Sequence, residues 1–318
     1  MKSIVLFLLS FLFLGSLAGQ EFSDPVQYFD FLNNQHNQLA AKNLEYVQYS
    51  VHSDDVQEVE TKRVEVINQL GKAILKVGTL PPYEKDDGMR AELLTVLKVY
   101  LESFEIEFTE INMLKSKSSD SFESMQEYLN AQDAAEKNLA RAADQYQKSQ
   151  REFAERHNIK LLEAEENSEI NQINKVNAYY RVVFMKYFRI SKLNAAFTDA
   201  MNEKDSENME KSRLKLLQAS REELKKLQLF PDFNGDTQFR DAGIALVTFY
   251  KDLAEAEYKK MVNIMGKAEL TQEDVDTYNS VINLINSQTG TLTNAYNNAL
   301  NTLLRNNVPK PAIATQRI

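Results

Sequence analysis

Hydrophobic residues recur along this chain at alternating spacings of three and four. The two clearest stripes are Leu94, Leu97, Leu101, Phe104, Phe108 and Ile111, and then Val275, Tyr278, Ile282, Ile285, Leu292, Tyr296 and Leu303. Such spacing keeps one face of a helix apolar over several turns. No segment shows the sustained alternation of apolar and polar residues that is typical of a strand. The pattern therefore predicts an all-α protein.

Glycine and proline stand mostly at the ends of the periodic segments, where they terminate helices. Pro25 follows Asp24, a pair suited to an N-cap and a first helical turn. We predict eight long helices, at 25–51, 54–77, 88–116, 120–157, 168–202, 205–228, 237–265 and 271–306. Because the connections are short, we expect neighbouring helices to run antiparallel.

The chain also matches itself. Residues 24–159 align with residues 174–309 without a gap, at a constant offset of 150. The matched pairs include Val26/Val176, Glu60/Glu210, Arg63/Arg213, Lys76/Lys226, Pro81/Pro231, Arg90/Arg240, Tyr100/Tyr250, Tyr128/Tyr278 and Tyr146/Tyr296. Many matches at one offset indicate a duplicated unit. We predict a tandem duplication of a four-helix up-down bundle, with repeats at 19–160 and 161–308 and a tail at 309–318.

Two interpretations of the boundary between the repeats are open. Glu163, Glu165 and Glu166 make the segment from His157 to Ser168 acidic, as expected of a solvated linker. A continuous helix joining the two units fits the same residues.

The N-terminus has the pattern of an export signal. Lys2 precedes an apolar run from Ile4 to Leu14, and small residues follow, which predicts a signal peptide at 1–18 that is cleaved after Ala18. The alternative is a retained membrane anchor, although the apolar run is shorter than the roughly 20 residues that span a bilayer. Position 20 is Gln rather than Cys, which excludes lipid attachment at a lipoprotein box.

Composition narrows the classes of function. The chain has no cysteine, so it forms neither disulfides nor thiolate metal sites. Its formal net charge of −9, without a basic block, argues against nucleic acid or an anionic membrane as the main partner. About 300 residues remain after signal cleavage, enough for two domains with substantial cores.

Two pairs of arginines are the candidate site residues. Arg63 and Arg213 fall on inward-facing stripes, each three residues after a glutamate, Glu60 or Glu210. They either orient an anionic ligand or form structural ion pairs, since a buried guanidinium needs partners.

Arg90 and Arg240 open the third helix of each repeat. They either contact an anion at a helix N-terminus or tie down the preceding loop, through carboxylates such as Asp86 and Asp87 or Asp232 and Asp236.

Motifs for metal or covalent chemistry are incomplete. Residues 232–236 resemble the start of a calcium loop, but Thr237 and Gly243 stand where an EF-hand needs glycine and glutamate, so we expect a turn with Asp236 as the helix cap. None of His36, His52 and His157 has a glutamate three residues before it, as a di-iron bundle requires. There is no Gly-x-Ser-x-Gly motif and no glycine-rich phosphate loop. We therefore expect no cofactor and no catalysis.

An aromatic-rich run from Tyr179 to Phe188 is the most hydrophobic part of the mature chain. The run could line a ligand-binding site, form a partner-binding face or associate with a membrane surface. It also fits a central helix that is covered by neighbouring helices on several sides. Arg181 and Lys186 interrupt the run, and its length is insufficient to span a membrane.

The export signal followed by Asp24-Pro25-Val26-Gln27-Tyr28, with long amphipathic helices and no cysteine, resembles a group of uncharacterised exported bacterial surface proteins made of helices. The resemblance implies a periplasmic or cell-surface location and no known activity, so no functional residues are carried over from it.

We expect a non-catalytic binding or structural module of the cell envelope, whose long polar faces bind an envelope protein, a polymer or a second copy. The alternative is a carrier that holds a small acidic or amphiphilic ligand near Arg63 or Arg213. An enzyme would require a cleft that joins a histidine to carboxylates, for instance His157 to Glu155 and the acidic segment.

Overall fold

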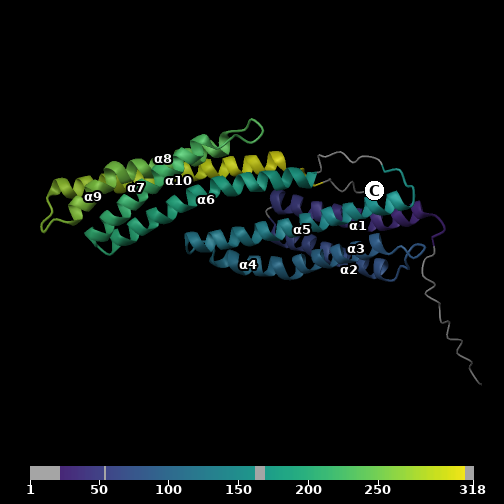
Figure 1. Ribbon diagram of the computed structural model, residues 1–318. Coiled ribbons are helices and arrows are strands. Elements are labelled where there is room, and N and C mark those ends of the chain that lie inside the picture. The colour runs from purple at the N-terminus through teal and green to yellow at the C-terminus, as the bar shows by residue number, and fades with distance from the viewer. Residues whose placement is uncertain (1–21, 54, 162–168, 312–318) are drawn as a thin grey trace, which may run out of the picture.

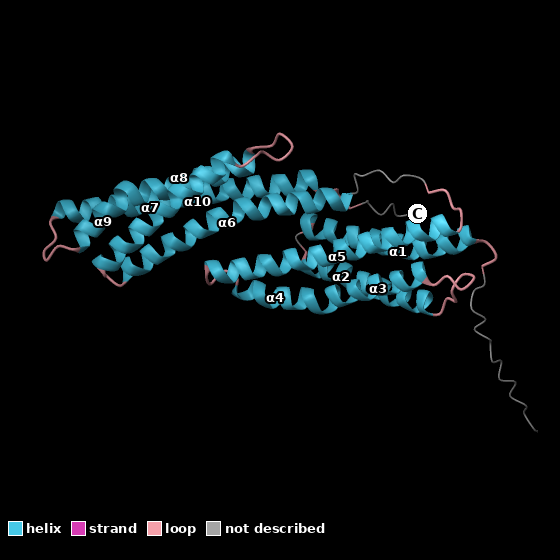
Figure 2. Ribbon diagram, viewed as in Figure 1, coloured by secondary structure: helices cyan, strands magenta, loops and turns pink. Residues whose placement is uncertain are grey.

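The computed structural model describes residues 22–53, 55–161 and 169–311, and these residues form long helices joined by short turns (Figure 1, Figure 2). The predicted signal peptide and the acidic residues of the predicted linker lie outside the described residues. The only β-type pairs within these ranges are two isolated bridges, Tyr83 with Asp86 and Phe233 with Asp236. The protein is therefore all-α, as the hydrophobic pattern predicts.

The first half contains α1 (Pro25–His52), α2 (Val56–Gly78), α3 (Gly88–Glu102), α4 (Phe108–Lys117) and α5 (Phe122–Arg156). The second half contains α6 (Glu169–Asn202), α7 (Ser206–Leu229), α8 (Gln238–Asp252), α9 (Tyr258–Met265) and α10 (Gln272–Asn307). The eight predicted helices correspond to these elements with shifts of a few residues at their ends. Each predicted third helix is interrupted by a π-helical turn, η1 (Ser103–Glu107) or η2 (Leu253–Glu257).

Side chains at the N-termini explain where several helices begin. The Asp24 carboxylate accepts a hydrogen bond from the Val26 amide at 2.8 Å, and Pro25 occupies the first helical position. Thr271 and Asp274 form a reciprocal capping box at the start of α10. The expectation for Asp236 needs correction, because the cap position of α8 is Thr237. Asp236 lies one residue earlier and accepts from the Gln238 amide at 2.9 Å.

Two hydrophobic cores lie within the two halves. In the first core, Leu32, Leu70, Leu93 and Phe153 are fully covered, and in the second Val183, Leu216 and Leu246 are. Leu44, Val47 and Val51, near the end of α1, pack against the second core instead of the first. The first helix therefore belongs to one bundle and also covers the other.

Local features recur at the offset of 150 found in the sequence. The turns η1 and η2 are 150 residues apart, and so are the bridges Tyr83–Asp86 and Phe233–Asp236. The turn that contains the bridge Phe233–Asp236 is the segment that resembles a calcium loop. In this turn the Asp232 carboxylate accepts a hydrogen bond from the Gly235 amide at 2.8 Å. The descent of both halves from one copied block stays a prediction.

The two bundles touch along α5 and α6 (Figure 1). Arg181 on α6 donates to both carboxylate oxygens of Glu136 on α5, at 2.9 and 2.6 Å. At the end of α1, the His52 ring lies 2.9 Å from the Val308 carbonyl just after α10. Contacts at the end of α1 and along α5 therefore both join the two bundles.

The aromatic run lies on α6, which packs against α7, α8 and α10 as well as α5. Tyr179 and Val183 are buried in the second core, while Val182 is 38% exposed on another side. This placement fits a central helix that is covered by several neighbours. Among the described residues, no helix combines the length and the apolarity needed to cross a membrane.

Candidate functional site

The paired arginines of the second and seventh helices make the same contacts in both bundles. Arg63 donates from Nε and Nη2 to the Glu60 carboxylate at 2.9 and 2.8 Å, and from Nη1 to the Phe104 carbonyl at 2.8 Å. Arg213 donates to Glu210 at 2.6 and 2.6 Å and to the Ala254 carbonyl at 2.8 Å. In each bundle the guanidinium therefore joins a carboxylate of its own helix to the facing π-helical turn.

The π-helical turns explain why an arginine is needed there. An extra residue within a helical turn disturbs the regular pairing of N–H groups with carbonyls, and a buried carbonyl without a donor is costly. Arg63 and Arg213 bring a donor to a carbonyl within η1 and η2. Their ion pairs lower the pKa values of Glu60 and Glu210, because the carboxylates accept charged hydrogen bonds. These contacts make both arginines structural ion-pair residues.

Arg90 and Arg240 tie the start of the third helix to the end of the second in each bundle. Arg90 Nη2 lies 2.9 Å from the Asp87 carboxylate, and Nη1 lies 3.4 Å from the Val77 carbonyl. Arg240 donates to the Phe230 carbonyl at 3.0 Å and to Asp241 at 3.1 Å. The sequence suggested Asp232 or Asp236 as carboxylate partners of Arg240, whereas the structure places Asp241 there.

His157 lies beside Asp86, whereas the sequence suggested Glu155 and the acidic segment as its neighbours. Its Nε2 is 3.1 Å from Asp86, which also accepts two hydrogen bonds from Arg156 at 2.7 and 3.0 Å. Burial alone would raise the pKa of Asp86, but Arg156, the Gly88 amide and His157 together lower it. The His157 ring packs on Phe153, with centroids 4.3 Å apart. This cluster fastens the turn after α2 to the end of α5.

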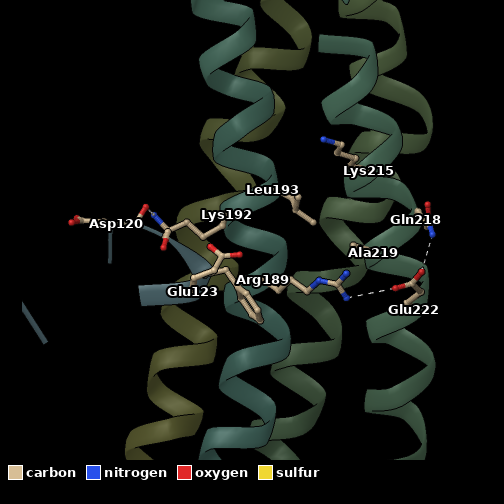
Figure 3. Close-up of a pocket in the computed structure, with 11 residues that line it drawn as sticks. Asp120, Glu123, Arg189, Lys192, Leu193, Lys215, Gln218, Ala219 and Glu222 are labelled. Atoms are coloured by element: carbon tan, nitrogen blue, oxygen red, sulfur yellow. Dashed lines mark hydrogen bonds and ion pairs between the residues drawn. The ribbon is translucent and has the colours of Figure 1, made fainter. Parts of the chain in front are cut away.

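A groove of about 490 Å³ lies between the two bundles (Figure 3). Its walls come from the start of α5, the middle of α6 and the middle of α7. The lining residues are Asp120, Ser121, Phe122, Glu123, Arg189, Lys192, Leu193, Lys215, Gln218, Ala219 and Glu222. Sequence reasoning missed this groove, because no motif marks residues that only the packing of two bundles brings together.

Charges of both signs face the groove, and they are unequally paired. Arg189 contacts Glu222 at 3.5 Å and Glu223 at 2.7 Å. Lys192 lies 3.3 Å from the backbone carbonyl of Asp120. Within the described parts of the chain, Lys215 makes no ion pair, and it is exposed. Lys215 is therefore a cation of the groove that no described carboxylate pairs with.

A second surface of interest runs along α10. From position 277 to position 304 the chain carries no charged residue, whereas the matching positions 127–154 on α5 carry nine. The segment contains seven asparagines, and all seven are exposed on α10. They are Asn279, Asn283, Asn286, Asn294, Asn297, Asn298 and Asn301. We call the exposed surface of residues 279–301 the amide face.

The side chains that could ligate a metal do not come together in the described part of the chain. Within the ranges that the structure describes, no group of three or more histidine and carboxylate side chains is placed to hold a metal ion. The three histidines lie apart, with His36 against Tyr146, His52 at the end of α1 and His157 at the end of α5.

Comparison with known proteins adds no assignment. No protein-family model, curated protein or solved structure matches the chain.

Proposed function

We propose that this protein is an exported, non-catalytic module of a cell envelope that binds its partner along a polar helix face. The observation that carries the proposal is the amide face of α10. In a chain with 26% charged residues, it is an exposed surface about 33 Å long that has no charge and many hydrogen-bonding groups. The placement of the candidate arginines also supports the proposal, since their guanidinium groups are engaged within their own bundles.

The composition of α10 is unfavourable for a helix that serves only as structure. Asparagine, threonine and glycine each cost roughly 0.6 to 1 kcal/mol relative to alanine inside a helix. The corresponding helix α5 uses alanine, glutamate, lysine and arginine at many of these positions, and these are stronger helix formers. A surface role is a physical reason for retaining so many weak helix formers in α10.

Capture from envelopes of the producing cells tests the binding role. The full-length tagged protein is cross-linked gently in the native envelope, and bound material is compared with that of the variant N294D/N297D. Q145E/Q147E is the matched control, because it adds the same charge at exposed positions of α5. We expect a specific partner with the parent and the control but not with N294D/N297D. Recovery of no specific material would contradict the proposal.

Export is tested separately by fractionation and by the mass of the mature chain. We expect the protein outside the cytoplasm with Gly19 as its first residue, since the predicted cleavage follows Ala18. An intact N-terminus in the cytoplasmic fraction would refute export.

A second candidate function is the carriage of a small acidic or amphiphilic ligand. The groove between the bundles supports it, because Lys215 on α7 makes no ion pair with a described residue and Lys192 on the neighbouring helix α6 also lines the groove (Figure 3). This site replaces the neighbourhood of Arg63 and Arg213, whose donors are directed at Glu60, Glu210 and backbone carbonyls.

Native mass spectrometry of protein purified from its own cells tests carriage. Retained mass that disappears in K192Q/K215Q, but remains in a variant of the exposed lysine Lys225, would support it. The apo mass alone, with no thermal shift on addition of envelope extract, would remove this candidate.

A further inference from the structure

The amide face has a regular geometry. At 100° per residue, six of its seven asparagines fall within a sector of about 80° around the axis of α10. They are Asn279, Asn283, Asn286, Asn294, Asn297 and Asn301. The amide groups therefore form one straight row along the helix.

These amides are unused inside the protein. Among the described residues, no hydrogen bond joins any of the seven side chains to another residue, and each amide has two donors and a carbonyl acceptor. Ser287 and Thr291 lie along one side of the row and add hydroxyl groups, although these donate to carbonyls one turn earlier. The row offers donors and acceptors together at each of its turns except the one at Gly290.

Gly290 lies at the centre of the same sector. A side-chain carbon added there would have nothing within 4 Å, so no packing against a neighbour explains the glycine. Glycine inside a helix is destabilising, and it lets another molecule approach the backbone closely. The gap in the row of asparagines is therefore a flat position where a ligand can lie against the helix.

The chemistry of the face restricts the partner. A polyanion or a polycation would find no opposite charge between positions 277 and 304. A partner helix with an apolar seam would find only Leu284 as a large exposed apolar side chain in this segment, at 38% exposure. A second copy of the chain would be repelled because it carries the same net charge of −9, and it would offer as little apolar surface at this face.

We infer that the amide face binds a neutral polysaccharide. Sugar hydroxyl groups donate and accept hydrogen bonds as amides do, carry no charge, and recur along an extended polymer. The length of the row, about 33 Å, suits several consecutive sugar units instead of a single small molecule. The inference names the partner class of the proposed binding module and rests on that function.

Affinity electrophoresis of the full-length protein tests this assignment. Gels contain dextran, laminarin or soluble starch as neutral probes, and alginate as an anionic probe. We expect at least one neutral probe to retard the protein and alginate to leave its mobility unchanged. N294D/N297D should weaken the apparent affinity about tenfold or more, because each lost hydrogen bond costs roughly fivefold. Q145E/Q147E should retain the affinity of the parent.

Each other outcome overturns the assignment. Failure of every neutral probe to retard the protein, or equal retardation of both variants, would show that the amide face does not bind neutral polysaccharide. Sedimentation analysis of the same samples tests whether a second copy of the chain binds the amide face instead. That result requires the parent and Q145E/Q147E to be dimers and N294D/N297D to be a monomer. A protein captured from envelopes that depends on Asn294 and Asn297 would preserve the proposed function and refute the polysaccharide.

Discussion

At the scale of single residues, the two bundles differ at a buried tyrosine. Tyr146 donates to the Asn33 side chain at 2.9 Å, and in the second bundle Val183 stands at the position of Asn33. Tyr296, the counterpart of Tyr146, is 2% exposed, and its hydroxyl has no hydrogen-bond partner among the described residues. Burial raises the pKa of Tyr296 well above its ordinary value. An unpaired buried hydroxyl costs about 1 to 3 kcal/mol.

Opposite effects are expected when the two hydroxyls are removed. Tyr296→Phe should raise the free energy of unfolding by about 1 kcal/mol, because it removes a desolvated group that has no partner. Tyr146→Phe should lower it by about 1 kcal/mol, because Asn33 loses a donor. Urea unfolding followed by circular dichroism measures both changes. A loss of stability in both variants would contradict the assignment of Tyr296 as unpaired.

A buried carboxylate marks the second bundle as well. Glu223 is 4% exposed and lies among Lys186, Arg189 and Lys226, at 3.4, 2.7 and 2.9 Å. Burial by itself raises the pKa of Glu223, but the three cations outweigh it, so that the pKa is lower than the ordinary value of 4.5. The matching residue of the first bundle, Ala73, is fully buried and carries no charge.

This carboxylate should make the second bundle sensitive to acid. Its stabilising contribution is complete above pH 4.5, the ordinary value, and is lost as the pH falls through the lower folded-state pKa. Glu223→Gln should cost about 2 kcal/mol at neutral pH and flatten the acid dependence. Hydrogen exchange resolved to each bundle, at pH values between about 3 and 6, measures this. An unchanged acid profile in Glu223→Gln would rule out the role of Glu223.

At the scale of elements, the sequence predicts the helices well and their irregularities poorly. Alternating spacings of three and four, together with caps such as Asp24, determine most helix boundaries. The π-helical turns escape this reasoning, because the spacing of three and four continues without a break through Leu101, Phe104 and Ile111. Arg63 and Glu60 were visible as a pair, but the Phe104 carbonyl that completes their site depends on the distance between two helices.

The stability of each π-helical turn should depend on its arginine. Arg213→Met removes the donor to the Ala254 carbonyl and leaves Glu210 unpaired, at a cost of about 3 kcal/mol. Arg63→Met should cost less, because the Arg63 side chain is 21% exposed while that of Arg213 is 7% exposed. Thermal unfolding and the hydrogen exchange of residues 253–257 measure the effect. Equal losses in both variants would contradict the dependence on burial.

At the scale of the whole molecule, the contacts between the two bundles follow from the sequence of neither bundle alone. Arg181 and Glu136 have no recognisable motif, and Lys192 and Lys215 are ordinary surface lysines in the sequence. The groove that they help to line exists because α6 and α7 lie beside the start of α5. The packing of one bundle against the other depends on the complementary shape of surfaces that many residues form. The periodic spacing of apolar residues within each helix does not reveal these surfaces.

The Arg181–Glu136 pair should control how closely the bundles associate. Glu136→Gln weakens the bidentate contact without opening either core, so we expect an unfolding free energy within about 1 kcal/mol of the parent. The average distance between the bundles should increase, as measured by X-ray scattering in solution. Glu127→Gln, on an exposed part of α5, serves as the control. An unchanged scattering profile in Glu136→Gln would show that other contacts suffice.

The end of α1 has a consequence for the order of assembly. Leu44, Val47 and Val51 lie on the earliest helix of the chain, yet they cover a core whose last helix is the final one to be synthesised. The contact between the His52 ring and the Val308 carbonyl likewise joins residues that are 256 positions apart, so it forms only after Val308 has been synthesised. The earliest helix can therefore complete its packing only after nearly the entire polypeptide has emerged, which postpones full maturation of the molecule until translation is almost finished.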